Sequence, residues 1–289
     1  MDIAITGSSG LIGSALATAL RAEGHRVRPV VRRAPSGPDE IGMDGLDLTG
    51  VDAVVHLAGE GIAEKRWDDE QKRKILESRT IGTDVVARAV AAAGVPVLLS
   101  GSAIGFYGDR GDDVLTEEAG PGDGFLPDLC VQWEAAAQPA VDAGARVAFL
   151  RTGIVLSPKG GALAKLLPLF KLGVGGRMGS GKQWVSWITL EDEVRAIQHL
   201  LTTDVRGPVN LTAPNPVTNA EQAKTLGRVL KRPSFLPTPS FGPKLVLGAE
   251  LADTLLNDSQ RVVPAVLQSS GFAHALPELE KALRALLGK

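Results

Sequence analysis

The chain has 289 residues, of which 44% are hydrophobic, and this length favours one large domain with a smaller second one. Its formal net charge is −2, from 31 basic and 33 acidic residues, so it lacks the basic footprint of a nucleic-acid-binding protein. The single cysteine excludes an internal disulfide, and no uncharged apolar run approaches the length of a membrane span.

The first predicted element is a strand that ends in a glycine-rich loop and runs directly into a helix. Residues 3–13 read Ile-Ala-Ile-Thr-Gly-Ser-Ser-Gly-Leu-Ile-Gly, and apolar residues then repeat at helical spacing up to Leu20. Glycine is needed where the chain turns sharply, where backbone approaches a pyrophosphate, and where helix packs on strand. The loop therefore predicts dinucleotide binding at a helix N-terminus, against the alternative of a plain tight turn. Its glycines are Gly7, Gly10 and Gly13.

The second predicted strand, residues 25–31, ends in Arg32 and Arg33, about twenty residues past the glycines. In dinucleotide folds this position selects the cofactor, because a carboxylate there takes the ribose hydroxyls of NAD, whereas arginine pairs with the 2′-phosphate of NADP. No acidic residue follows the strand before Asp39. Arg32 therefore predicts NADP, and the alternative is a solvated basic turn.

Strand-like and helix-like segments alternate along the next part of the chain, which predicts an α/β fold with a doubly wound parallel sheet. One apolar strand contains His56, which we interpret as a satisfied core histidine because the other histidines lack metal-ligand spacing; no metal site is indicated. The expected elements are a strand over 51–59, helix over 67–93, strand over 95–100, helix over 129–143 and strand over 146–150.

The remainder predicts a smaller, mostly helical substrate domain. Its expected parts are a helix over 160–172, a glycine-rich loop over 173–181, a capping box at 218–221, a proline-rich linker over 233–243 and a last helix over 277–288. A helix over 189–201 and a strand over 209–212 return to the nucleotide domain. We therefore assign 1–152 with 187–213 to a Rossmann-like domain, and 153–186 with 214–289 to the substrate side.

Several different short motifs are spread along nearly the whole chain. They are the glycine loop, 56–59, 78–79 before 82–83, 100–102 with 106–108, 125–126 before 133–134, 151–153, 179–181 before 183–188, and 259–264. Together they resemble an extended short-chain dehydrogenase/reductase, and specifically the atypical branch labelled epimerase family protein, which ends in an uncharacterised domain.

The resemblance implies an NADP-type cofactor, with its phosphates near Ser8, Ser9, Leu11 and Ile12 and its 2′-phosphate near Arg32. Arg79 stands where extended relatives carry an asparagine, and it is a candidate for an extra phosphate or ribose contact. The remaining cofactor-binding residues that the resemblance implies are Leu57, Ala58, Gly59, Lys74 and Arg151.

The sequence departs from this superfamily in its catalytic pair. The superfamily uses Tyr-x-x-x-Lys, in which the lysine lowers the pKa of the tyrosine so that the phenol exchanges a proton with the substrate. The single tyrosine here is Tyr107, position 111 is glycine, and no lysine occurs between Lys74 and Lys159. Standard chemistry is therefore excluded. The candidates for proton transfer are Ser102, Glu134 or water, and Tyr107 is retained as a candidate recruited by another route.

Ligands of open α/β sheets bind beyond the carboxyl ends of the strands, so we expect the second domain to supply the other wall of the site. The predicted wall is formed by Gln183, Trp184 and Trp187, with one tryptophan expected to pack between the domains. The alternative wall lies around Glu60 and Phe125.

Three functions remain open from the sequence. The first is an NADP-dependent oxidoreductase or epimerase acting on a small polar, nucleotide-linked carbonyl or alcohol. The second is a non-catalytic NADP-binding regulator, since some relatives carry cell-division labels, and the third is a scaffold with a vestigial cofactor site. Because the glycine loop begins at residue 7, we expect no signal peptide and a cytoplasmic monomer or homodimer, with no nucleic-acid or membrane partner.

Overall fold

The computed structural model describes residues 1–63, 65–235 and 258–289. Its centre is a seven-stranded sheet in the order β11-β7-β5-β4-β1-β2-β3, and every neighbouring pair is parallel. Strand order reverses between β1 and β4, which is where doubly wound folds bind ligands. The strands are β1 (Asp2–Thr6), β2 (Arg26–Val31), β3 (Ile41–Gly42), β4 (Ala53–His56), β5 (Val97–Ala103), β7 (Arg146–Thr152) and β11 (Gly207–Leu211).

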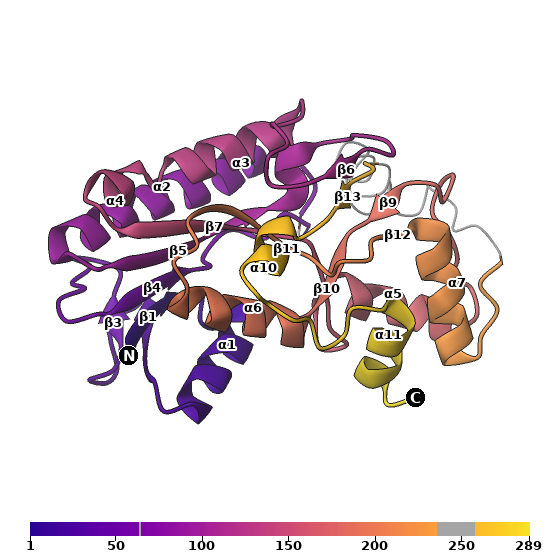
Figure 1. Cartoon of the computed structure of the whole chain (residues 1–289), viewed down its shortest axis with the longest axis horizontal. Helices are drawn as coiled ribbons and strands as arrows, with labels where there is room; N and C mark the ends of the chain where they lie inside the picture. The colour runs from indigo at the N-terminus through magenta and orange to yellow at the C-terminus, as the bar shows by residue number, and fades with distance from the viewer. Residues whose placement is uncertain (64, 236–257) are drawn as a thin grey trace.

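Helices cover both faces of this sheet, as Figure 1 shows. One face carries α2 (Asp69–Ala93), α3 (Phe125–Ala135) and α4 (Gln138–Asp142), and the other carries α1 (Leu11–Ala22), α6 (Leu190–Thr202) and α10 (Ala265–Ser269). Side chains alternate along each strand, so Ile3 and Ile5 pack with α1 and α6 while Ala4 packs with α2. The Rossmann-like fold is therefore confirmed.

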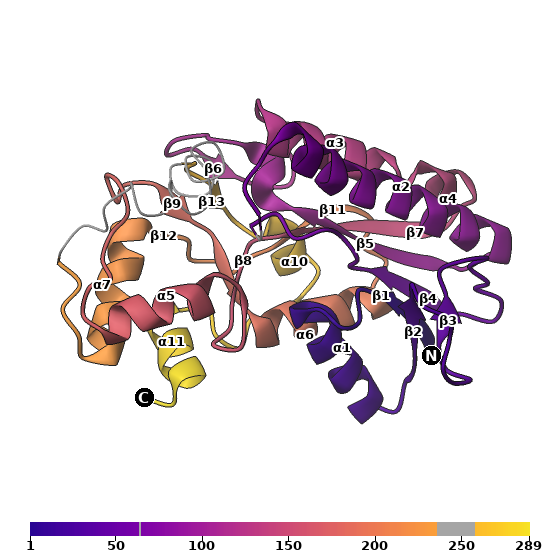
Figure 2. The same cartoon turned by 180° about the vertical axis from the view of Figure 1, so that it is seen from behind.

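A second layer of short elements lies beyond the carboxyl ends of the strands, where Figure 2 shows α5, α7 and α11 together. A separate apolar core joins them, built around Leu163, Phe170, Trp187, Leu226 and Leu283. The elements are β8 (Ile154–Leu156), α5 (Gly161–Lys171), β9 (Trp184–Val185), β10 (Trp187–Thr189), β12 (Val217–Thr218), α7 (Asn219–Leu230) and α11 (Leu279–Leu287). Three further short elements are the 3-10 turn η1 (Ile104–Tyr107), which follows β5, and the paired strands β6 (Val114–Leu115) and β13 (Arg261–Val262).

Several boundaries differ from the sequence-based expectation. The prediction of a single helix over 129–143 was wrong, because α3 and α4 are separate helices. Pro139 lies in the first turn of α4 and has no amide hydrogen with which to continue α3. Strands β5 and β7 run further than expected, to Ala103 and Thr152. The capping box at Thr218 and the helix end at Gly288 are confirmed. Residues 236–243 of the expected linker lie outside the described residues.

Candidate functional site

A cavity of about 400 Å³ lies at the carboxyl ends of β1, β4, β5 and β7. It extends from the glycine loop to Ser102 and Thr152, and the start of α5 borders it from the second layer. Its lining residues are Gly7, Gly10, Leu11, Ile12, Gly13, Leu57, Gly101, Ser102, Trp133, Thr152, Ile154, Val155, Gly161 and Ala162.

The glycine loop is held in a conformation that side chains would break. Gly7 has φ of +67°, and a Cβ atom there would lie 2.8 Å from the Leu57 carbonyl carbon. A Cβ atom on Gly13 would lie 2.2 Å from the Gly7 oxygen. Gly10 begins α1, and no side chain caps its first turn, which leaves amide groups for an anion. Ser8 and Ser9 lie in the same turn.

A buried hydrogen-bond network fixes the loop after β4 against β1. Thr6 Oγ1 accepts from the amides of Leu57 and Ala58, at 3.1 and 3.2 Å, and lies 2.7 Å from His56 Nδ1. His56 Nε2 lies 3.0 Å from Thr83 Oγ1, so both ring nitrogens have partners. Burial lowers the pKa of His56 to about 4. The prediction of a satisfied core histidine is confirmed, and its effect is to position the backbone of Leu57 and Ala58.

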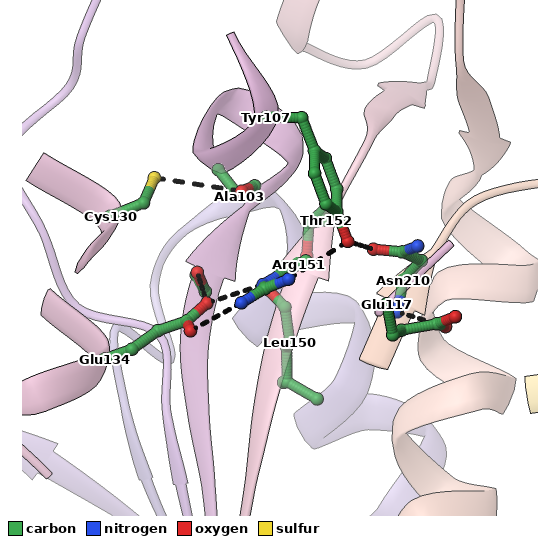
Figure 3. Close-up of polar contacts among 10 residues, drawn as sticks. Ala103, Tyr107, Glu117, Cys130, Glu134, Leu150, Arg151, Thr152 and Asn210 are labelled. Carbon is green, nitrogen blue, oxygen red and sulfur yellow. Dashed lines mark hydrogen bonds and ion pairs between the residues drawn. The ribbon is translucent and has the colours of Figure 1, made fainter. Parts of the chain in front are cut away.

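Ser102, at the end of β5, is the cavity hydroxyl nearest to an ion pair. Its Oγ donates to Glu134 Oε1 at 2.7 Å. The Arg151 guanidinium donates to the two oxygens of the same carboxylate at 2.8 and 2.9 Å, and Figure 3 shows this double contact. Since Ser102 and Arg151 are register partners on parallel strands, they project from the same face of the sheet toward α3. The sequence candidates Ser102 and Glu134 are thus in direct contact.

Tyr107 is buried beside this ion pair, of which Arg151 is the buried cation. The Tyr107 hydroxyl donates to Asn210 Oδ1 at 2.7 Å and accepts from Arg151 at 3.1 Å (Figure 3). Burial raises the pKa of the phenol above its usual value. Neither side chain lines the cavity, because Arg151 turns toward Glu134 and the next residue, Thr152, faces the cavity instead.

Arg32, Lys74 and Arg79, the basic residues expected to contact the cofactor, lie in different surroundings. Arg33 is paired with Glu40, whereas Arg32 is exposed and has no polar side-chain partner within the described ranges. Lys74 pairs with Glu70 on the exposed side of α2, away from the cavity. Arg79 is half-buried against the cavity residue Trp133: its guanidinium carbon lies 4.9 Å from the indole centroid, and it donates to the Glu60 carbonyl oxygen at 2.9 Å.

None of the residues of the expected substrate wall, Gln183, Trp184 and Trp187, lines this cavity. Trp187 is completely buried in the core of the second layer, and its indole donates to the Asn215 oxygen at 3.1 Å. Trp184 donates to Asp112 at 2.8 Å and lies under the Arg261 guanidinium, which places it outside the cavity. The second layer supplies instead Ile154, Val155, Gly161 and Ala162.

Sequence reasoning gave no role to Trp133 or Thr152, although both lie inside the short motifs at 133–134 and 151–153. It also missed Glu193 in the first turn of α6, whose buried carboxyl lies 2.9 Å from the Thr152 hydroxyl. An acidic residue inside an otherwise apolar, buried helical face is the signal that marks Glu193.

No helix within the described residues is long and apolar enough to cross a membrane. In the same part of the chain, no group of three or more histidine, cysteine, aspartate or glutamate side chains is arranged to hold a metal ion.

Similarity to known proteins agrees with this geometry. The chain is 49% identical over 278 residues to epimerase family protein Mb2239 of Mycobacterium bovis, covering 93% of this chain and 92% of that protein. The crystal structure of human epimerase family protein SDR39U1 (isoform2) with NADPH superposes with a TM-score of 0.93 at 34% identity, over 100% of both chains.

A nucleoside-diphosphate sugar epimerase from Corynebacterium glutamicum gives a TM-score of 0.81 at 39% identity, over 100% of this chain and 58% of that chain. Residues 238–286 match a domain of unknown function, and residues 3–212 match the model of the NAD dependent epimerase/dehydratase family. The chain therefore belongs to the NAD dependent epimerase/dehydratase family, among the epimerase family proteins that resemble SDR39U1.

Proposed function

We propose that the protein binds NADP(H) and acts as an oxidoreductase or nucleotide-sugar-type epimerase on a small polar carbonyl or alcohol. One observation carries this proposal: one cavity extends from the glycine loop to Ser102, whose hydroxyl donates a hydrogen bond to Glu134. A dinucleotide needs a phosphate site and a reaction site connected in this way. The NADPH in the human SDR39U1 structure supports the choice of cofactor.

The residues around the cavity suit the parts of NADP. The uncapped first turn of α1 would hold the phosphates, with Gly7 and Gly13 allowing close approach. The backbone of Leu57, Ala58 and Gly59 would contact the nucleoside, and the exposed Arg32 would pair with the 2′-phosphate. When bound, NADPH supplies a hydride and NADP⁺ accepts one. We assign the predicted contact from Arg79 to the rim beside Trp133.

Proton transfer at the substrate oxygen is assigned to Ser102 and Glu134. When an alcohol is oxidised, its hydroxyl proton passes to Ser102 Oγ as the serine proton passes to Glu134 Oε1, 2.7 Å away. Reduction of a carbonyl runs the same two transfers in reverse. Arg151 holds the carboxylate in place by its two hydrogen bonds. This pair takes the place of the missing Tyr-x-x-x-Lys.

The test compares cofactor binding with turnover. Calorimetry should show NADPH binding to the unmodified protein and, within about threefold, to Ser102→Ala and Glu134→Gln, since neither side chain is assigned to the cofactor. Reduction of carbonyl compounds from a nucleotide-sugar and small-aldehyde panel should fall at least about a hundredfold in both variants. Glu118→Gln changes an exposed carboxyl and is the matched control. Absence of NADPH binding would refute the proposal, and binding without any turnover would favour the non-catalytic regulator.

A further inference from the structure

The cavity has a second hydroxyl that contacts a carboxyl group. Thr152 follows Arg151 on β7, so its side chain projects to the opposite face of the sheet, toward α6. There its Oγ1 lies 2.9 Å from Glu193 Oε1. Ser102 with Glu134 and Thr152 with Glu193 therefore lie on opposite faces of the sheet, and both Ser102 and Thr152 line the same cavity.

The two carboxyl groups differ in what surrounds them. Glu134 has the Arg151 guanidinium, whereas Glu193 is completely buried and its Oε2 has no hydrogen-bond partner within the described residues. An ionised carboxylate left without a cation in an apolar layer carries a large desolvation cost, so such a group is retained as the neutral acid. Burial, opposed only by the Thr152 hydrogen bond, raises the pKa of Glu193 to about 8.

No nearby charge offsets this burial. The elements packed against α6 are α1, β5, β7, β8 and β10. Their charged side chains are Arg21, exposed in the last turn of α1, and Arg146 and Arg151 of β7. Arg146 donates to the Leu200 and Leu201 carbonyl oxygens in the last turn of α6, and Arg151 pairs with Glu134 on the other face of the sheet. On α6 itself, Asp192 is engaged by Arg195 and by the amides of residues 275 and 276, and Glu191 is exposed. The core between the sheet and α6, to which Val194, Ile197 and Ile188 belong, is built of apolar residues.

The protonation state of Glu193 decides where the single Thr152 hydroxyl hydrogen points. An ionised Glu193 would take that hydrogen, and the competing acceptor, the Leu150 oxygen, lies at 3.3 Å. A protonated Glu193 donates its own O–H to Thr152 Oγ1 and leaves the threonine hydrogen free for a better acceptor in the cavity. The two states thus differ in whether the cavity wall presents a hydrogen-bond donor.

We propose that Thr152 and Glu193 form a neutral donor pair, in which the acid form of Glu193 directs the Thr152 hydroxyl into the cavity toward a carbonyl oxygen of the bound ligand. This inference rests on the proposed function. The carbonyl oxygen belongs either to the nicotinamide carboxamide or to the substrate. Thr152 donates to the ligand, and Glu193 is a positioning residue. A fixed donor that faces a carbonyl oxygen stabilises negative charge developing on it.

The first measurement uses the protein without ligand. Infrared difference spectra at pH 7 between the unmodified protein and Glu193→Gln should show a protonated-carboxyl C=O band that is lost in the variant. The exposed Glu191→Gln, two residues away, is the matched control and should leave the band in place. A spectrum of the unmodified protein without this band would overturn the proposal, independently of any cofactor.

The second measurement follows NADPH affinity, by calorimetry, from pH 7 to pH 9. If the carboxamide is the ligand oxygen, affinity in the unmodified protein should fall about tenfold, the size of one hydrogen bond, as Glu193 ionises. Glu193→Gln should bind at full strength without this pH dependence, because its amide donates to Thr152 as the acid does. Thr152→Val should bind weakly at every pH, and Thr152→Ser should restore binding.

If NADPH affinity is the same in all variants, the substrate is the source of the oxygen. The same pattern must then appear in kcat/KM for carbonyl reduction: loss above pH 8 in the unmodified protein, no such loss in Glu193→Gln, and a low value in Thr152→Val. Glu193→Gln behaving like Thr152→Val in both measurements would overturn the pair. Failure of the unmodified protein to bind NADPH would instead refute the proposed function, while the infrared band would still decide the state of Glu193.

Discussion

The hydroxyl of Tyr107 donates a 2.7 Å hydrogen bond to Oδ1 of Asn210, 103 positions further along the chain. Asn210 lies on the edge strand β11, and its backbone amide donates to the buried carboxylate of Glu117 at 2.9 Å. The only tyrosine of the chain thus joins η1 to the edge strand of the sheet. This arrangement stabilises the fold, and it contains no lysine that would activate the phenol.

We therefore expect Tyr107→Phe to lower stability while leaving function largely intact. Loss of the hydroxyl leaves Asn210 Oδ1 without its donor, at a cost of about 1–2 kcal/mol in the free energy of unfolding. NADPH affinity and any turnover should stay within about threefold, because Tyr107 does not line the cavity. Urea unfolding and calorimetry measure the two quantities. A fall in turnover approaching a hundredfold would show that Tyr107 takes part in proton transfer.

Cofactor choice should depend on Arg32 and not on its neighbour. We expect the protein to bind NADPH more tightly than NADH, and Arg32→Glu to remove that preference by repelling the 2′-phosphate. Arg33→Gln is the matched control, since Arg33 is already paired with Glu40 and should leave the preference unchanged. Equal calorimetric affinities for the two cofactors in the unmodified protein would contradict the assignment.

Tryptophan emission should report binding through Trp133. It is the only tryptophan that lines the cavity, whereas Trp184 and Trp187 are engaged elsewhere. NADP⁺ quenches indole emission by contact, so saturating NADP⁺ should dim the protein. The quenching should disappear in Trp133→Phe and persist in Trp187→Phe. Quenching that survives loss of Trp133 would place the ring of the cofactor outside this cavity.

The buried His56 should make stability fall in acid. Its pKa is about 4 in the folded protein against an ordinary value of 6.5, so between these values the unfolded chain binds more protons. The contribution of His56 to the free energy of unfolding is complete above pH 6.5 and is lost as the pH falls to 4. The full contribution is about 3 kcal/mol.

Glu193 acts in the opposite sense in part of this range, because its raised pKa favours the folded state at low pH. The His56 contribution is therefore measured as the difference between the unmodified protein and His56→Asn, by urea unfolding from pH 4 to pH 7. A difference that does not change with pH would show that the histidine is not held neutral.

The glycine loop, the alternation of strands and helices and the missing catalytic pair could all be predicted from the sequence. Gly7 has a positive φ, and the Gly7 oxygen lies too close to Gly13 for a Cβ atom there. Both positions therefore need glycine, and the glycine spacing marks the loop in the sequence. The alternation of strands and helices is likewise encoded locally, in the spacing of apolar residues. The sequence has no lysine between positions 74 and 159, and this alone excludes the usual Tyr-x-x-x-Lys pair.

Only the tertiary structure decided which side chains share the cavity. Trp184 and Trp187 look alike in sequence, but β9 and β10 pair with different strands, which buries Trp187 in the second core and leaves Trp184 against Arg261. Thr152 and Glu193 are 41 positions apart and became partners because β7 and α6 pack together. Such contacts depend on burial and on strand register, and both are set by segments that are distant in the sequence. A local sequence pattern therefore cannot predict them.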